Sequence, residues 1–180
     1  MTLRSQMQSQ TLAALALFVF VSGVVVQAAG PAQIPDKFLG SWAVDKSENF
    51  DEYLEAKGYG WFMRQMVKLA SITKIFTKKG DNLYNCKILT TKKDVEWDNW
   101  KLDEEFQAEY LDESQHKITF SYDPVGDKLI EKHIKVGSDE KDVYEYTIDG
   151  QGYLVMRMEY GGVVTKRYYK RLPKPSIVYG

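Results

Sequence analysis

Residues 154–171 read LVMRMEYGGVVTKRYYKR, two runs typical of strands that are joined by Gly161-Gly162. Two glycines between alternating runs predict a tight β-hairpin, because glycine readily takes the positive φ that such turns need. A two-residue turn sets the register and pairs Tyr160 with Val163. Every second pair beyond it then lies on the same face of the sheet, so the turn decides which side chains point inward.

The two faces of this hairpin differ in polarity. One carries charge and is expected in water: Arg157, Glu159, Lys166, Tyr168 and Lys170. The other is apolar except for Thr165, Arg167 and Tyr169, so we expect Arg167 to point inward. A buried arginine is costly without a partner. Either an internal acid pairs with it, or an anionic ligand does, with the Tyr169 hydroxyl adding a hydrogen bond.

The rest of the chain repeats this strand-and-turn pattern at intervals of about 8–12 residues, which predicts an all-β sandwich or barrel. Short turns between sequential strands favour an up-and-down antiparallel barrel, in which closure removes the exposed edges. Ten strands are expected, at residues 38–45, 72–78, 82–90, 95–102, 105–111, 116–122, 128–136, 142–149, 153–160 and 163–171.

Two short helices are predicted between the first two strands. In the first, Ser47 is the expected N-cap and Gly58 the expected end. In the second, within residues 60–70, Phe62 and Met66 share an apolar face with Leu69 and Ala70.

The first 28 residues have the pattern of a secretory signal peptide. Arg4 precedes an apolar run over residues 12–26, and small residues at Val26 and Ala28 suit a signal peptidase. A membrane anchor is the alternative, but about 15 residues are short for a span of about 20. We therefore predict a secreted protein with one domain, residues 29–180, ending in a short tail at 172–180.

Composition argues against several functions. The 24 Lys and Arg nearly balance the 25 Asp and Glu, so nucleic acid is not an expected partner. Cys86 is the single cysteine, so no internal disulfide can form. The G-x-S-x-G, H-E-x-x-H and phosphate-loop motifs do not occur, and neither an enzyme nor a cofactor is expected. His116 and His133 lie on different predicted strands without ligand-like spacing, which favours structural roles over metal binding.

Several motifs resemble the fatty-acid-binding protein family. GSWAV at 40–44 and NFDEYL at 49–54 look like its signature, and the final Arg-x-Tyr at 167–169 completes it. The resemblance covers about residues 35–171. It implies a ten-stranded barrel with a helix–turn–helix lid between strands one and two, and a fatty acid inside. Most members are cytosolic, whereas the signal peptide, GYGW and HKITF are similar to the secreted nematode branch.

The resemblance also implies site residues. Arg167 and Tyr169 match the pair that binds the ligand carboxylate, and Met156 and Met158 match positions lining the cavity. The lid and portal, or their packing, would include Phe50, Tyr53, Phe62 and Met66.

Two departures from the family pattern stand out. The family usually supplies a second arginine from the strand before the final hairpin, but the matching position here is Tyr146 or Glu145. The segment KKDVEWDNWKL is longer than usual and would present Trp97 and Trp100 near the portal. Exposed tryptophans there would suit transient membrane contact; alternatively, they pack a wide turn.

The sequence therefore predicts a monomeric extracellular carrier of long-chain fatty acids, with retinoids as a second ligand class. Two alternatives stay open. A lipocalin also begins with Gly-x-Trp, although the helix pair after the first strand and the lone cysteine argue against it. An extracellular structural protein would have a filled barrel and bind no lipid.

Overall fold

The computed structural model describes residues 33–174. The predicted signal peptide, residues 1–28, lies outside the described residues, as do residues 175–180 of the predicted tail. A 3-10 turn, η1 (Asp36–Phe38), precedes two α-helices and ten strands. The helices are α1 (Phe50–Ala56) and α2 (Trp61–Leu69). The strands are β1 (Gly40–Glu48), β2 (Ile72–Gly80), β3 (Leu83–Thr90), β4 (Val95–Trp100), β5 (Phe106–Glu109), β6 (Gln115–Asp123), β7 (Lys128–Lys135), β8 (Lys141–Ile148), β9 (Leu154–Tyr160) and β10 (Val163–Arg171).

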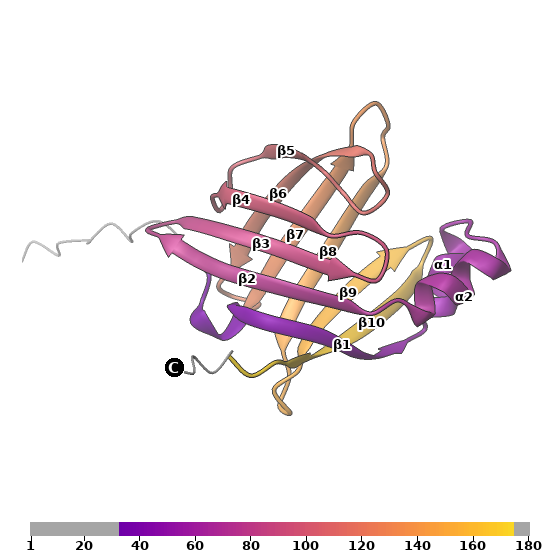
Figure 1. Cartoon of the computed structure of the whole chain (residues 1–180), viewed down its shortest axis with the longest axis horizontal. Helices are drawn as coiled ribbons and strands as arrows, with labels where there is room; N and C mark the ends of the chain where they lie inside the picture. Colours follow the sequence, from indigo (N-terminus) through magenta and orange to yellow (C-terminus); the bar gives the residue numbers. More distant parts are fainter. Residues whose placement is uncertain (1–32, 175–180) are drawn as a thin grey trace, which may run out of the picture.

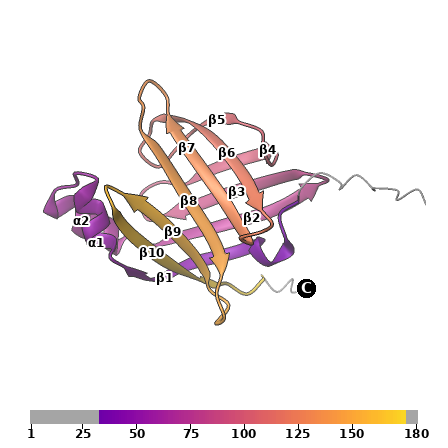
Figure 2. The same ribbon diagram turned by 180° about the vertical axis from the view of Figure 1, so that it is seen from behind.

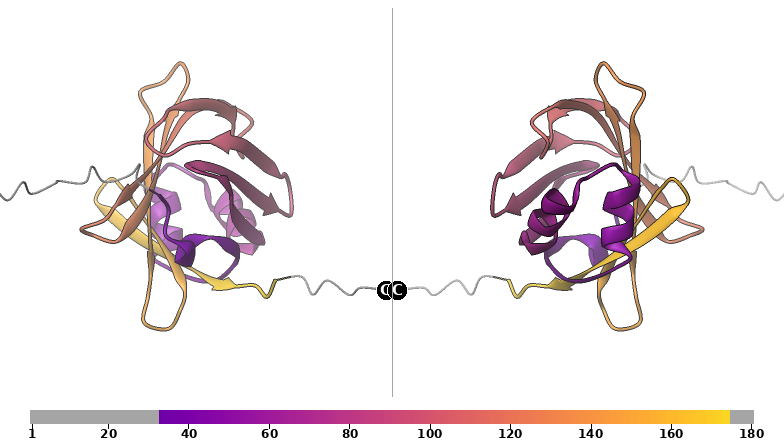
Figure 3. Two further views of the ribbon diagram at one scale, coloured as in Figure 1. Left: turned by 90° about the vertical axis from the view of Figure 1, so that its left-hand side faces the viewer. Right: turned by 90° about the vertical axis from the view of Figure 1, so that its right-hand side faces the viewer.

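The strands form one antiparallel sheet that curls into a nearly closed barrel (Figures 1 and 2). Their order is β4-β3-β2-β1-β10-β9-β8-β7-β6-β5, so β1 pairs with β10 and the two edges are β4 and β5. The two helices lie between β1 and β2 and cover one end of the barrel (Figure 3). This confirms the predicted up-and-down barrel with a helical lid. A lipocalin barrel has eight strands, so the ten strands exclude that alternative.

The final hairpin has the register that the double glycine predicted. Tyr160 pairs with Val163, and Met156 pairs with Arg167. Gly161 and Gly162 take φ values of 56° and 80°, which glycine adopts without steric penalty.

The start of the lid differs from the prediction. Strand β1 continues to Glu48, so Ser47 belongs to the strand and does not cap α1. The residue before α1 is Asn49, in the left-handed region with φ 51° and ψ 28°. Asparagine tolerates that conformation better than most residues, and the Asn49 side chain donates a hydrogen bond to the Val164 carbonyl at 3.3 Å. The chain thereby turns sharply from β1 into the lid.

The barrel end opposite the lid is filled with aromatic side chains. Its fully buried members include Phe38, Trp42, Phe76, Tyr84 and Phe120. Rings from facing strands meet here, as Phe76 does with Phe120 at a centroid distance of 6.3 Å. This end of the barrel interior is therefore filled by side chains.

Trp97 and Trp100 join this packing, which contradicts their predicted exposure near the portal. Each is 3% exposed. The Trp97 Nε1 donates to the Glu109 carbonyl at 3.1 Å, and the Trp100 ring stacks on Phe120 at 4.1 Å. Both lie in strand β4 and pack into the barrel core.

Candidate ligand-binding site

A cavity of about 390 Å³ lies between the lid and the packed half of the barrel. This volume is near the lower end of the roughly 300–1,000 Å³ typical of small-molecule sites. Its walls are mainly aliphatic and aromatic, but they also include charged side chains: Lys57, Lys74, Lys92, Lys93, Asp112, Glu140, Asp142 and Arg167. The apolar lining includes Phe50, Tyr53, Met63, Val67, Ile72, Ile88, Met156 and Met158.

Arg167 is buried at the edge of this cavity, with 5% of its surface exposed. Its Nε donates to the Ser47 Oγ at 3.2 Å, and the guanidinium lies 4.2 Å from the centroid of the Phe50 ring. No carboxylate among residues 33–174 lies within ion-pair distance of Arg167. The guanidinium thus keeps unused donors that face a hollow space, an arrangement that suits an anion.

Tyr169 lies on the same face of β10, two residues further along. It is fully buried and lines the cavity. Its hydroxyl makes one contact in the described part of the chain, a weak one to the Met156 sulfur at 3.9 Å. The hydroxyl is therefore available as a second donor beside Arg167.

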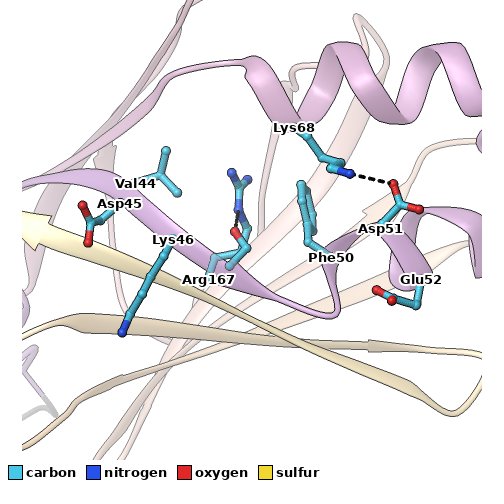
Figure 4. A pocket seen from close by; sticks show the side chains of 9 residues that line it. Val44, Asp45, Lys46, Phe50, Asp51, Glu52, Lys68 and Arg167 are labelled. Carbon is cyan, nitrogen blue, oxygen red and sulfur yellow. Dashed lines mark hydrogen bonds and ion pairs between the residues drawn. The ribbon is translucent and has the colours of Figure 1, made fainter.

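Arg167 also borders a second, polar hollow of about 360 Å³ between β1 and the lid. Figure 4 shows its guanidinium reaching into this space from β10, with the Phe50 ring beside it. Lys68 of α2 closes the far side through an ion pair with Asp51 at 3.1 Å. Arg167 thus lies between an apolar cavity and a charged one.

An ion pair crosses the barrel beneath the cavity. Lys74 of β2 donates to the Glu131 Oε2 on β7 at 3.2 Å and to the Tyr146 hydroxyl on β8. Glu131 also accepts hydrogen bonds from Tyr146 and from the His133 Nε2, the latter at 2.7 Å. The four side chains are between 0% and 3% exposed.

The charges of this pair hold each other in the ionised state. Burial alone would raise the Glu131 pKa, but Lys74, His133 and Tyr146 together lower it to about 2. Burial alone would lower the Lys74 pKa, but the Glu131 carboxylate raises it above its usual value. An internal acid therefore exists, as one sequence alternative supposed, but it pairs with Lys74 and not with Arg167.

The structure brings most of the predicted site residues together. Around the cavity lie Phe50, Tyr53, Met156, Met158, Arg167 and Tyr169. Tyr146 lies just beneath it and hydrogen-bonds Lys74.

Phe62 and Met66 belong to the lid but point away from the cavity. They are 67% and 55% exposed, whereas Met63 and Val67 of the same helix line the cavity. The helix has two apolar faces, and its periodicity alone does not tell which one the barrel covers.

Sequence reasoning missed Lys74 and Glu131. A signal for both was present in strand alternation, because Lys74 shares its face with Ile72 and Phe76. Glu131 likewise shares its face with Leu129 and His133. Within residues 33–174 no cluster of potential ligands suits a metal ion, and no helix is both long and apolar enough to span a bilayer.

Comparison with known proteins places this barrel among lipid carriers. A fatty acid-binding protein homolog of Ascaris suum is 51% identical over 166 residues, covering 89% of this chain and 98% of the relative. The solved structure of As-p18, an extracellular fatty acid binding protein, superposes with a TM-score of 0.74 at 51% identity. The match covers 78% of this chain and all of As-p18.

A more distant likeness is the Schistosoma mansoni fatty acid binding protein in complex with arachidonic acid, with a TM-score of 0.65 and 26% identity. That match covers 78% of this chain and all of the other. No protein-family model matches the chain. The fold and the buried Arg-x-Tyr define a β-barrel protein with an internal ligand cavity. From the identity and coverage of its relatives, the chain belongs to the fatty-acid-binding protein family.

Proposed function

We propose that this protein is an extracellular carrier that encloses a long-chain fatty acid in the lid half of its barrel. The observation that carries the proposal is Arg167, a buried cation that borders an apolar cavity and has no carboxylate partner in residues 33–174. The ligand carboxylate would accept hydrogen bonds from Arg167 and Tyr169, and its chain would contact Met156, Met158 and the lid.

The two parts of such a ligand would contribute differently to affinity. Burying about 14 methylenes at roughly 0.8 kcal/mol each gives on the order of 11 kcal/mol before ordering costs. Truncating a buried charge contact typically costs about 2–5 kcal/mol. The hydrocarbon chain of the ligand would therefore supply most of the affinity, whereas Arg167 would set the orientation of the ligand and the preference for acids.

Secretion is the second part of the proposal. The pattern of residues 1–28 supports it, as does the relative described as extracellular. Detection of the protein in culture medium, shortened at the N-terminus to about residue 29, is the expected result. Retention inside the cell would contradict it.

Displacement of a fluorescent fatty acid from the delipidated protein tests the carrier function. Oleic acid should compete strongly, oleyl alcohol more weakly, and retinol should show whether retinoids share the site. Arg167→Ala should weaken oleic acid binding much more than oleyl alcohol binding. Arg157→Ala is the matched control, because Arg157 lies on the outer face of β9 and pairs with Glu159 at 2.5 Å. Equal losses for acid and alcohol in Arg167→Ala would refute the head-group role, and absence of any binding would refute the carrier.

Membrane contact during transfer is proposed at α2, since Trp97 and Trp100 are buried. The outer face of α2 exposes Trp61, Phe62, Met66 and Leu69, by 68%, 67%, 55% and 83%. Apolar side chains beside the exposed Lys68 suit insertion into an interface with anionic lipids. We propose that the protein acts as a monomer.

Ligand transfer to vesicles tests this contact. The double change Phe62→Ser and Leu69→Ser should slow transfer to anionic vesicles and leave equilibrium affinity unchanged. Val125→Ser is the control, because Val125 is 95% exposed on the β6–β7 turn. Unchanged transfer in the double variant would contradict the proposal.

A further inference from the structure

Lys74 has the position of a ligand contact. It lies on the inward face of β2, between Ile72 above it and Phe76 below it, and is 3% exposed. Ile72 lines the cavity and Phe76 belongs to the packed aromatic half. Lys74 therefore forms part of the cavity floor, as does Tyr169 on the other side.

One N–H group of the Lys74 ammonium has no hydrogen-bond acceptor among the described residues. A lysine ammonium has three N–H groups and accepts none. Glu131 takes one and Tyr146 takes another, and no further acceptor for Lys74 occurs in the described part of the chain. A side chain that lines a cavity and has a spare charged donor is complementary to an oxygen of a ligand.

The buried charges of the barrel do not balance. Three buried side chains among residues 33–174 carry a charge when histidine is neutral: Lys74, Arg167 and Glu131. Glu131 compensates one cation, which leaves the positive charge of Arg167 between the apolar cavity and the charged hollow. A ligand carboxylate at this cavity would compensate that charge, whereas a neutral lipid would leave it without a counter-ion.

The neighbours of Lys74 explain why a lysine can serve here. Glu131 keeps the ammonium charged when the cavity is empty, and Tyr146 fixes its position from β8. Both are positioning residues, since neither lines the cavity.

We propose that Lys74 is the second cationic contact of the ligand carboxylate, beside Arg167, and that Lys74, held in place by Glu131, favours ligands with a free carboxylate. This inference rests on the proposed fatty-acid carrier function. It assigns the ligand class more narrowly, to lipid acids over lipid alcohols and esters.

The decisive variant removes the pair as a unit. Lys74→Met alone would leave Glu131 buried without its cation, so its losses would mix stability with binding. The double change Lys74→Met and Glu131→Gln removes one buried charge of each sign, so it creates no new uncompensated charge. Its binding of oleic acid should weaken about 10- to 100-fold, the size of a hydrogen bond to a charged group, with oleyl alcohol binding changed less than about threefold. The pKa of the bound acid, followed through the ¹³C shift of a labelled carboxyl carbon, should rise.

Three results would separate the explanations. A double variant with the wild-type preference for acid over alcohol and an unchanged ligand pKa would overturn the role of Lys74. It would leave the carrier function intact, provided that Arg167→Ala still loses the acid preference. A wild-type protein that binds neither lipid would overturn both proposals.

A measurement on the wild-type protein serves if the double variant does not fold. The ¹⁵N resonance of the buried Lys74 Nζ should shift when oleic acid is added and not when oleyl alcohol is added. Its assignment comes from a Lys74→Arg variant, which keeps the charge. An unchanged resonance at saturating oleic acid would overturn the inference.

Discussion

Lys57, at the end of α1, is joined to Asp142 of β8 across the mouth of the cavity. Its Nζ lies 2.7 and 2.8 Å from the two carboxylate oxygens of Asp142, and 3.3 Å from the Glu140 carboxylate. The Lys57 and Asp142 side chains are only 11% and 14% exposed. All three residues line the cavity, so this contact holds the lid against the opposite wall of the barrel.

Asp142→Asn should therefore speed ligand release. Partly buried ion pairs are screened less by salt than exposed ones, so the effect should persist at moderate ionic strength. We expect the dissociation rate to rise about 3- to 10-fold, equivalent to roughly 1 kcal/mol, in stopped-flow transfer to vesicles. Glu96→Gln is the control, because the Lys87–Glu96 pair lies exposed on the barrel wall. Equal rates in both variants would show that the Lys57–Asp142 contact does not restrain the lid.

Glu131 should make the protein sensitive to acid. Its pKa is about 2 in the folded state, against an ordinary value of 4.5. Because its folded-state pKa lies below the ordinary value, ionised Glu131 stabilises the fold at pH values above about 4.5. That stabilisation is lost as the pH falls from about 4.5 towards about 2. The difference amounts to about 3 kcal/mol. Urea denaturation across this pH range should show that the free energy of unfolding falls less steeply with pH in the Lys74→Met/Glu131→Gln variant than in the wild type. Parallel pH dependences of the two proteins would contradict the lowered pKa of Glu131.

The buried and exposed tryptophans should respond oppositely to truncation. Trp97→Ala removes a ring packed on Phe106 and Phe120 and should lower the free energy of unfolding by about 3–5 kcal/mol. Trp61→Ala removes a ring that is 68% exposed and should change the free energy of unfolding by less than about 0.5 kcal/mol. Chemical denaturation of both variants measures this, and a mild effect of Trp97→Ala would contradict the packing.

Cys86 should be inert in the folded protein. It is fully buried on β3, and burial raises the pKa of its thiol above the ordinary value. Because the thiolate is the reactive form, a thiol reagent should modify it only after unfolding. The expected result is no reaction in native buffer and one thiol per chain in denaturant. Rapid labelling of the native protein would contradict this.

The features predictable from the sequence were those set by strand alternation. The double glycine at 161–162 fixes the hairpin register, and the register alone places Arg167 and Tyr169 inside. The same alternation applies to Lys74, but a lysine in a strand is ordinarily read as solvated. Its burial depends on Glu131, 57 residues away in the sequence, and no local pattern reveals that partner.

The lid was the least predictable part. Periodicity identifies α2 but not which of its two apolar faces the barrel covers, since that depends on how the helix packs against α1 and over the cavity. Ser47 has the usual chemistry of an N-cap, yet pairing of Ser47 with Arg167 in β10 extends β1 past it. Tertiary contacts override the local preference in both cases.

The seam between β4 and β5 has a consequence for self-association. No backbone ladder joins these two edges in the described sheet; side chains bridge them, with Trp97 donating to Glu109 and its ring against Phe106. Unpaired strand edges are templates for the addition of strands from other chains. Trp97, which belongs to the core, and Phe106, which packs against it, therefore also cover the unpaired edges of β4 and β5. A change that loosens Trp97 should lead to aggregation in a concentrated fluid before it leads to loss of the cavity.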